Sequence, residues 1–217
     1  MCGRSYHSGV RLILASASPR RAELLSLAGY RFEIRTADID ESVRPGERPH
    51  DYVRRLAAEK GAAVQARMQA DGAADRRAAD VADNRTNDGG ADVLIVAADT
   101  SVIVDDQILG KPVDAADAER MLRLLSGRSH LVLTGVSVRS GSREVGVVAE
   151  TAVFVQALSE ADIAWYVASG EGVDKAGAYA IQGLASRFIT RIDGSYANVV
   201  GLPVAEVARL LNAVVMK

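Results

Sequence analysis

Apolar runs with strand character alternate along this chain with longer segments in which apolar residues recur at helical spacing. The apolar runs predict strands at residues 10–16, 32–36, 93–98, 129–138, 145–154, 178–181 and 188–192. The helical spacing predicts a helix from Pro19 to about Gly29 and further helices at 49–69, 116–125, 163–168 and about 203–215. Because strands and helices alternate, the pattern predicts an α/β protein.

Local signals support several of these boundaries. Ser18 followed by Pro19 is typical of a helix start, and Gly127 of a helix end. Ser159 and Asp162 have the spacing of a capping box before the helix at 163–168. The two strands on either side of residues 140–142 are expected to pair as a hairpin.

Residues 70–92 interrupt the pattern. They are rich in Ala, Asp, Arg, Asn and Gly and hold almost no large apolar side chain, so burial cannot offset the entropy of ordering them. We therefore expect a mobile insertion at 70–92, and a flexible N-terminus at 1–10. The length of 217 residues suits one large α/β domain or two small lobes that share a sheet.

Composition narrows the classes of partner. The formal net charge of −2 gives no general attraction to nucleic acid or to a membrane surface, and aromatic residues at 5% disfavour an RNA-binding module built on base stacking. The one cysteine, Cys2, excludes a disulfide framework and fits a reducing compartment. Residues 1–10 lack the apolar core of a signal peptide, and no apolar run reaches membrane-spanning length. We therefore expect a soluble, cytoplasmic protein.

Two motifs place small residues beside cationic or amide side chains, as a nucleoside triphosphate site requires. In LASASPRR, residues 14–21, both Arg20 and Arg21 fall in the first helical turn, where the helix dipole already favours anions. An anionic ligand explains this placement, and so does a capped helix with solvated arginines. In DKAGAYAIQG, residues 174–183, Lys175 lies close to glycines and Gln182 offers a paired donor and acceptor for a base edge.

Acidic residues follow two of the expected strands. Asp99 and Thr100 come after the apolar strand at 93–96, and open α/β sheets bind ligands at the carboxyl ends of their strands. Asp99 is therefore either a functional acid or a cap of the next turn. The segment DIDES, residues 38–42, holds Asp38, Asp40 and Glu41, which either share a divalent cation with Asp99 or are simply solvated.

Two lysines carry weaker signals. Lys111, in the segment LGKP, can reach a phosphate as a point charge, but Gly-Lys-Pro is also ordinary turn chemistry. Lys60 follows Glu59 on an expected helix and is by default a surface residue. Neither lysine identifies a site by its local sequence.

Taken in order, the segments LASASPRR, DIDES, AAEKG, AADTSV, LGKP, LSGRSHLVLTGV, DKAGAYAIQG and GSYANVVGLP resemble the Maf family of nucleoside triphosphate pyrophosphatases over nearly the whole chain. The resemblance implies an elongated α/β fold related to that of inosine triphosphatases, with two lobes around a central mixed sheet and a nucleotide in the cleft. It also implies hydrolysis of a nucleotide to its monophosphate and pyrophosphate with a divalent metal (Mg, Mn or Co), often by a homodimer.

The resemblance assigns roles to particular residues. Asp99 would accept a proton from water, beside a metal held together with Glu41. The positions implied to bind substrate are Ser16, Arg20, Arg21, Lys60, Thr100, Lys111, Lys175 and Gln182. Among these, Arg21 and the three lysines would face the triphosphate, whereas Arg20, Thr100 and Gln182 would tune the choice of base.

The resemblance also separates branches of the family. The pairing of ADT, residues 98–100, with AIQG, residues 180–183, accompanies preference for dTTP and UTP, and CTP or modified pyrimidine nucleotides are further candidates. A 7-methyl-GTP pyrophosphatase is one alternative, although that branch departs at both motifs. A regulator of septum formation that binds nucleotide without turnover is another. The chain departs from the family pattern in the insertion, the extra N-terminal residues and Ala180, where glycine is usual, and none of these removes a charged group.

Overall fold

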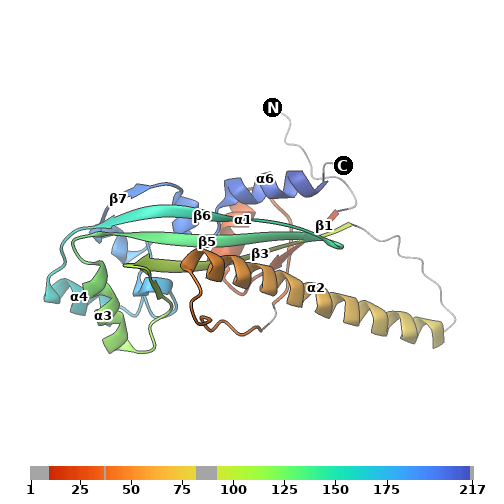
Figure 1. The fold of residues 1–217 in the computed structure, drawn as a ribbon, viewed down its shortest axis with the longest axis horizontal. Coiled ribbons are helices and arrows are strands. Elements are labelled where there is room, and N and C mark those ends of the chain that lie inside the picture. The colour runs from red at the N-terminus through yellow and green to blue at the C-terminus, as the bar shows by residue number, and fades with distance from the viewer. Residues whose placement is uncertain (1–9, 37, 82–91, 216–217) are drawn as a thin grey trace.

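One mixed sheet spans the length of the molecule in the computed structural model, which describes residues 10–36, 38–81 and 92–215 (Figure 1). Its strands are β1 (Val10–Ala15), β2 (Glu33–Ile34), β3 (Asp92–Val104), β4 (Gln107–Leu109), β5 (Ser129–Ser140), β6 (Arg143–Val155) and β7 (Ile189–Asp193). They lie in the order β2-β1-β3-β5-β6-β7, with β4 paired to β3. The pairs of β1 with β2 and β3 are parallel and the others are antiparallel.

Helices cover both faces of this sheet (Figure 1). They are α1 (Pro19–Leu27), α2 (Pro49–Val81), α3 (Ala115–Leu125), α4 (Glu160–Ala168), α5 (Tyr196–Val200) and α6 (Val204–Val215), with 3-10 turns η1 (Ala176–Ala178) and η2 (Leu184–Phe188). Alternate residues of β1 serve the two faces: Leu12 and Leu14 pack in a cluster with α1 and α6, whereas Ile13 and Ala15 pack against Val64 of α2.

The core divides into two lobes that share the long strands β3, β5 and β6. One lobe packs α3, α4 and both 3-10 turns against residues such as Val102, Val104 and Val132. The other packs α1 and α6 against Val96, Val136 and their neighbours. Helix α2 covers the opposite face of both lobes, with Leu56 in one cluster and Val64 in another. The two-lobed α/β fold expected from the sequence is therefore the fold observed.

The edge of β3 carries a short gap at the junction of the lobes. Strand β1 pairs with β3 only as far as Ala97, and β4 pairs with it only from Val102 onward. Residues 98–101 therefore lack a neighbouring strand on that side, although β5 pairs with them on the other. Side chains from both faces of the sheet can meet at this opening.

Most of the predicted elements are confirmed. The hairpin of β5 and β6, the helix that ends before Gly127, and the capping box of Ser159 and Asp162 are all present. Strand β3 is longer than expected, because four of the five residues from Thr100 to Val104 are β-branched and favour a strand.

Two expectations about secondary structure are wrong. The segment 70–81 is not a loop but the continuation of α2, because its alanines and arginines favour a helix even without apolar side chains to bury. The rest of that insertion, 82–91, lies outside the described residues, as does the expected flexible N-terminus except for Val10, which begins β1. The strand expected at 178–181 is also absent: the backbone there turns through η1, with positive φ angles of 69° at Gly177 and 57° at Ala178.

Candidate active site

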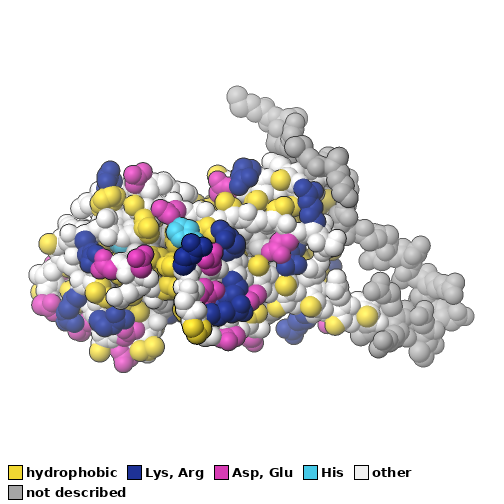
Figure 2. Space-filling model, viewed as in Figure 1, with side chains coloured by type: hydrophobic (Ala, Val, Ile, Leu, Met, Phe, Trp, Pro, Cys, Tyr) yellow, Lys and Arg dark blue, Asp and Glu magenta, His cyan; other side chains and the backbone are white. Residues whose placement is uncertain are grey.

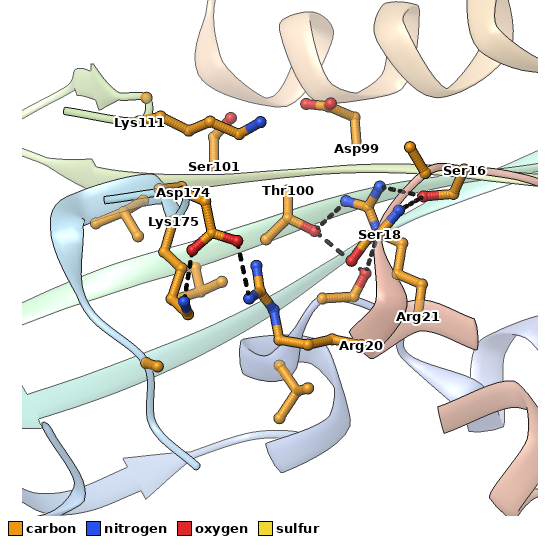
Figure 3. A pocket seen from close by; sticks show the side chains of 18 of the residues that line it. Ser16, Ser18, Arg20, Arg21, Asp99, Thr100, Ser101, Lys111, Asp174 and Lys175 are labelled. Carbon is orange, nitrogen blue, oxygen red and sulfur yellow. Dashed lines mark hydrogen bonds and ion pairs between the residues drawn. The ribbon is translucent and has the colours of Figure 1, made fainter. Parts of the chain in front are cut away.

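A cavity of about 650 Å³ opens beside the gap in β3, a size within the range of roughly 300–1,000 Å³ usual for small-molecule sites. All ten residues proposed from the sequence line it: Ser16, Arg20, Arg21, Glu41, Lys60, Asp99, Thr100, Lys111, Lys175 and Gln182. They come from strands, helices and loops of both lobes, and Figure 3 shows several of them facing the same space. The cavity is therefore the candidate active site.

Asp99 lies in the gap of β3, inside a long strand rather than at its end as the sequence indicated. Its side chain points to the α2 face and is almost buried, with 7% of the residue exposed. The carboxylate accepts a hydrogen bond of 2.6 Å from the Lys60 ammonium, which also contacts Glu41 at 2.8 Å. Lys60 is therefore not a surface lysine: α2 carries it into the cavity between two carboxylates.

Tyr52 supports this group from the first turns of α2. Its hydroxyl donates to the backbone carbonyl of Glu41 at 2.8 Å, which holds the loop that carries the Glu41 side chain. Burial raises the pKa of Tyr52 to about 12, and the nearby charges of Asp99 and Glu41 add to the effect. The hydroxyl therefore stays protonated and remains a donor. Nothing in the sequence marked this tyrosine.

Arg21 is held by the protein itself. Its guanidinium donates to the carbonyls of Gly201 at 2.7 Å and Ala98 at 2.8 Å, and to the hydroxyls of Thr100 and Ser16 at 2.9 and 3.3 Å. Burial lowers the pKa of Arg21, and the charge of Asp99 opposes that effect. Four of its five N–H groups are thus used on neutral acceptors, so Arg21 fixes the walls of the cavity and adds positive potential there.

Asp174 lies between two of the other cations (Figure 3). Its carboxylate contacts Lys175 at 2.6 Å and Arg20 at 3.5 Å, and the hydrogen bond from Lys175 is the main cause of its lowered pKa. The sequence placed Asp174 inside a motif without giving it a role. In the structure it occupies, as an anion, the space between two cationic groups of the kind that bind phosphate.

Two of the other lining residues are less constrained. Lys111 and Gln182 are exposed at the cavity, and neither side chain has a hydrogen bond or ion pair with the described part of the chain. Thr100 faces the other side of β3 from Asp99 and shares a hydrogen bond of 3.0 Å with Thr134. The first turn of α1 also lines the cavity, so the positive end of that helix dipole adds to the cationic side chains.

The carboxylates fit a divalent cation. Glu41 and Asp99 both contact the Lys60 nitrogen, at 2.8 and 2.6 Å, and neighbouring carboxylate oxygens suit a hard cation. Among the described residues no group of three or more His, Cys, Asp or Glu side chains could hold a metal by itself. Mg²⁺ is commonly held by two carboxylates, with water or substrate phosphate completing its coordination shell.

The fold and the cavity define an α/β protein with a polar cleft, lined by five cationic and four acidic side chains, at the junction of two lobes. The family model described as Maf-like protein matches residues 11–214, and the chain belongs to the Maf family. A relative from Anaeromyxobacter dehalogenans (strain 2CP-C), named dTTP/UTP pyrophosphatase, is 47% identical over 93% of each chain. Relatives of the same name from Chromobacterium violaceum and Geobacter sp. (strain M21) are 48% and 45% identical, over 93% or more of each chain.

Proposed function

We propose that this protein hydrolyses nucleoside triphosphates, with dTTP and UTP as the principal substrates, to the nucleoside monophosphate and pyrophosphate. Water attacks the α-phosphorus, the bond from that phosphorus to the bridging oxygen breaks, and pyrophosphate leaves. The relatives that share almost half of the sequence are named for this activity, which supports the proposal. In a cell the reaction would remove unwanted nucleotides from the pool.

One observation carries the proposal: a nearly buried carboxylate, Asp99, lies in the same cavity as five cationic side chains. These cations are Arg20, Arg21, Lys60, Lys111 and Lys175. The triphosphate carries several negative charges, and more charge develops on the leaving pyrophosphate in the transition state. A cleft with this composition stabilises that charge and places a base beside the attacking water.

In this proposal Asp99 is the catalytic residue that accepts the proton of the attacking water. The Lys60 nitrogen lies 2.6 Å from the Asp99 carboxylate, so it keeps that carboxylate oriented and contributes positive charge beside the phosphates. Lys111 is exposed at the cavity and able to move toward the polyphosphate tail. Lys175 can exchange its contact with Asp174 for phosphate oxygens when substrate enters.

We further propose that Glu41 and Asp99 hold a divalent metal, Mg, Mn or Co. Such a metal, when bound, would neutralise phosphate charge and lower the pKa of water.

We propose that a second set of residues lining the cavity selects the base. Gln182 offers both a donor and an acceptor, as reading the edge of a pyrimidine requires, and it has no competing partner in the described residues. Arg20 and Thr100 lie on the same cavity and complete the set implied by the family pattern. We propose no preference for 7-methyl-GTP, because the chain has the pairing of ADT with AIQG that accompanies preference for dTTP and UTP.

The localisation, oligomeric state and partners of the protein are also part of the proposal. We expect a cytoplasmic homodimer without a nucleic-acid partner. In the described ranges no helix is both long and apolar enough to cross a bilayer. On the face drawn in Figure 2, lysine and arginine side chains are interspersed with acidic ones, which does not favour a nucleic-acid backbone. Light scattering and a gel shift at moderate salt test these two expectations.

The activity is tested by incubating the purified protein with dTTP, UTP, CTP, modified pyrimidine nucleotides and 7-methyl-GTP, each with Mg²⁺, Mn²⁺ or Co²⁺. We expect monophosphate and pyrophosphate, fastest from dTTP and UTP. Release of diphosphate and phosphate would refute attack at the α-phosphorus. Tight nucleotide binding without turnover would favour the regulatory alternative.

Asp99→Asn tests the role of the carboxylate. We expect pyrophosphate release to fall at least about 100-fold, because the amide cannot accept the proton of water, while the fold persists. Asp105→Asn is the matched control, since Asp105 lies on the turn after the same strand, exposed and paired with Arg128. An Asp99→Asn protein with wild-type turnover would remove Asp99 from the mechanism.

A further inference from the structure

The residues 180–185, here called the base loop, carry Gln182 along the wall of the cavity. The Gln182 side chain is exposed and makes no hydrogen bond to the described residues, so its direction depends on the backbone that carries it. The base loop belongs to neither a long helix nor a strand: it runs from the end of η1 into η2. Something outside regular secondary structure must therefore hold it in place.

Two side chains beyond the cavity hold the base loop on both sides of Gln182. The Glu171 carboxylate accepts hydrogen bonds from the backbone N–H groups of Leu184 at 2.8 Å and Ala185 at 3.4 Å. The Tyr166 hydroxyl, on α4, accepts one from the N–H of Ala180 at 3.1 Å. Tyr166 in turn donates to Glu171 at 2.7 Å, which joins the two supports into one unit.

The packing around Gly183 is equally tight. A Cβ atom added at Gly183 would lie 1.9 Å from the nearer carboxylate oxygen of Glu171, so the loop passes directly over this carboxylate. Tyr166 is almost fully buried, with 1% of the residue exposed, which fixes the hydroxyl in place. The position of Gln182 is thus set by groups that do not themselves line the cavity.

The charge of Glu171 is maintained by the same contacts. Burial acts to raise its pKa, but the N–H of Leu184, the hydroxyl of Tyr166 and the N–H of Ala185 outweigh burial, and the pKa is lowered. The backbone carbonyl of Glu171 has a separate partner, the Lys175 ammonium at 2.5 Å. Residue 171 therefore supports the base loop through its side chain and a phosphate-binding lysine through its main chain.

We propose that Glu171 and Tyr166 are positioning residues for base selection: together they hold the base loop so that the Gln182 amide faces the nucleobase. This inference rests on the proposed function, since it presupposes a nucleoside triphosphate in the cavity. It assigns specificity to a carboxylate that substrate does not touch. The main-chain contact with Lys175 does not depend on the side chain at 171.

Glu171→Gln is the first test. The glutamine keeps the size of the side chain, but its NH₂ group replaces an oxygen that accepts hydrogen bonds, so the base loop shifts. We expect the ratio of kcat/KM for UTP over CTP to fall at least about 10-fold, mainly through KM for UTP. The inhibition constant of pyrophosphate, which has no base, should stay within about twofold of the wild-type value, because Lys175 keeps its carbonyl partner.

Two further variants separate specificity from general damage. Tyr166→Phe removes both hydrogen bonds of the hydroxyl while it keeps the ring, and it should lower the same ratio; it decides the question if Glu171→Gln fails to fold. Glu160→Gln is the matched control: it lies on the first turn of α4, exposed and paired with Arg123, and should leave the ratio unchanged. Circular dichroism verifies that each variant is folded.

The outcomes are distinguishable. An unchanged UTP to CTP ratio in folded Glu171→Gln or Tyr166→Phe protein overturns the inference. So does an equal loss for both nucleotides together with weaker inhibition by pyrophosphate, which would indicate a structural role. If the wild-type protein releases pyrophosphate from no nucleoside triphosphate, the proposed function itself fails and the inference fails with it.

Discussion

Arg20 and Arg21 are neighbours on α1 but have different structural roles. Arg21 is enclosed by four neutral acceptors from three segments of the chain, whereas Arg20 makes one contact of 3.5 Å with an exposed aspartate. A buried carbonyl that loses its donor costs about 1–3 kcal/mol, and an exposed ion pair contributes about 0–1 kcal/mol. The two arginines are equivalent in the sequence motif, but their burial and hydrogen bonding differ in the structure.

Arg21→Met should therefore destabilise the fold and Arg20→Met should not. We expect the free energy of unfolding to fall by about 2–4 kcal/mol in Arg21→Met, because the carbonyls of Ala98 and Gly201 lose their donor. In Arg20→Met, the matched control, it should change by less than about 0.5 kcal/mol. Urea unfolding of the two variants measures the difference. Equal losses would show that Arg21 does not hold the cavity walls.

At the scale of elements, the packing of α2 on β5 places Lys60 in the cavity. The helix backbone lies directly against Gly135, where an added Cβ would lie 2.1 Å from the carbonyl oxygen of Val53. Gly135 is paired with Asp99 across the sheet, so this close contact with the helix lies at the level of the candidate base. The absence of a side chain at one position thus brings a lysine on α2 within reach of a carboxylate on β3.

Gly135→Ala should push α2 away from the sheet. We expect the free energy of unfolding to fall by about 3 kcal/mol, and kcat/KM to fall at least about tenfold because Lys60 moves away from Asp99. Gly72→Ala is the control on the same helix: its Cβ meets nothing within 4 Å, and alanine should stabilise by about 0.5–1 kcal/mol. Thermal unfolding and steady-state kinetics test both. Wild-type activity in Gly135→Ala would contradict this view of α2.

The sequence predicted which residues meet in the cavity better than it predicted how they are held. The ten candidates were found because ordered motifs name residue types, and α/β alternation is strong along the chain. The gap in β3 was not predictable, because it depends on where β1 and β4 stop pairing. Likewise, the partners of Arg21 and Glu171 lie far along the chain or on backbone groups that leave no pattern in the sequence.

At the scale of the whole molecule, the two lobes are held together by β3, β5 and β6, and a buried histidine lies on the middle one of these strands. His130 of β5 contacts the Tyr179 hydroxyl at 2.8 Å, and its Nδ1 has no partner in the described residues. Tyr179 also lines the cavity. Burial lowers the pKa of His130 to about 4, because it disfavours the charged imidazolium.

The stability of the protein should therefore fall as the solution becomes mildly acidic. Above the unfolded pKa of about 6.5 both states hold a neutral imidazole, so His130 gives no pH dependence. Between that value and about 4 the unfolded chain binds a proton that the folded protein does not bind, and folding loses free energy as pH falls. From pH 7 to pH 5 the loss should reach about 2 kcal/mol.

Chemical unfolding at pH 7, 6 and 5 tests this expectation. In His130→Gln, which cannot titrate, the slope of unfolding free energy against pH should flatten, whatever the change in stability at pH 7. Carboxylates with lowered pKa, such as Glu47 at about 2, lose their contribution to stability mainly below pH 5, so they do not mask the effect of His130.

Identical slopes in His130→Gln and wild-type protein would contradict this expectation. They would mean that His130 is protonated within the folded core, and hence that the lobe around Tyr179 admits water or a second acceptor.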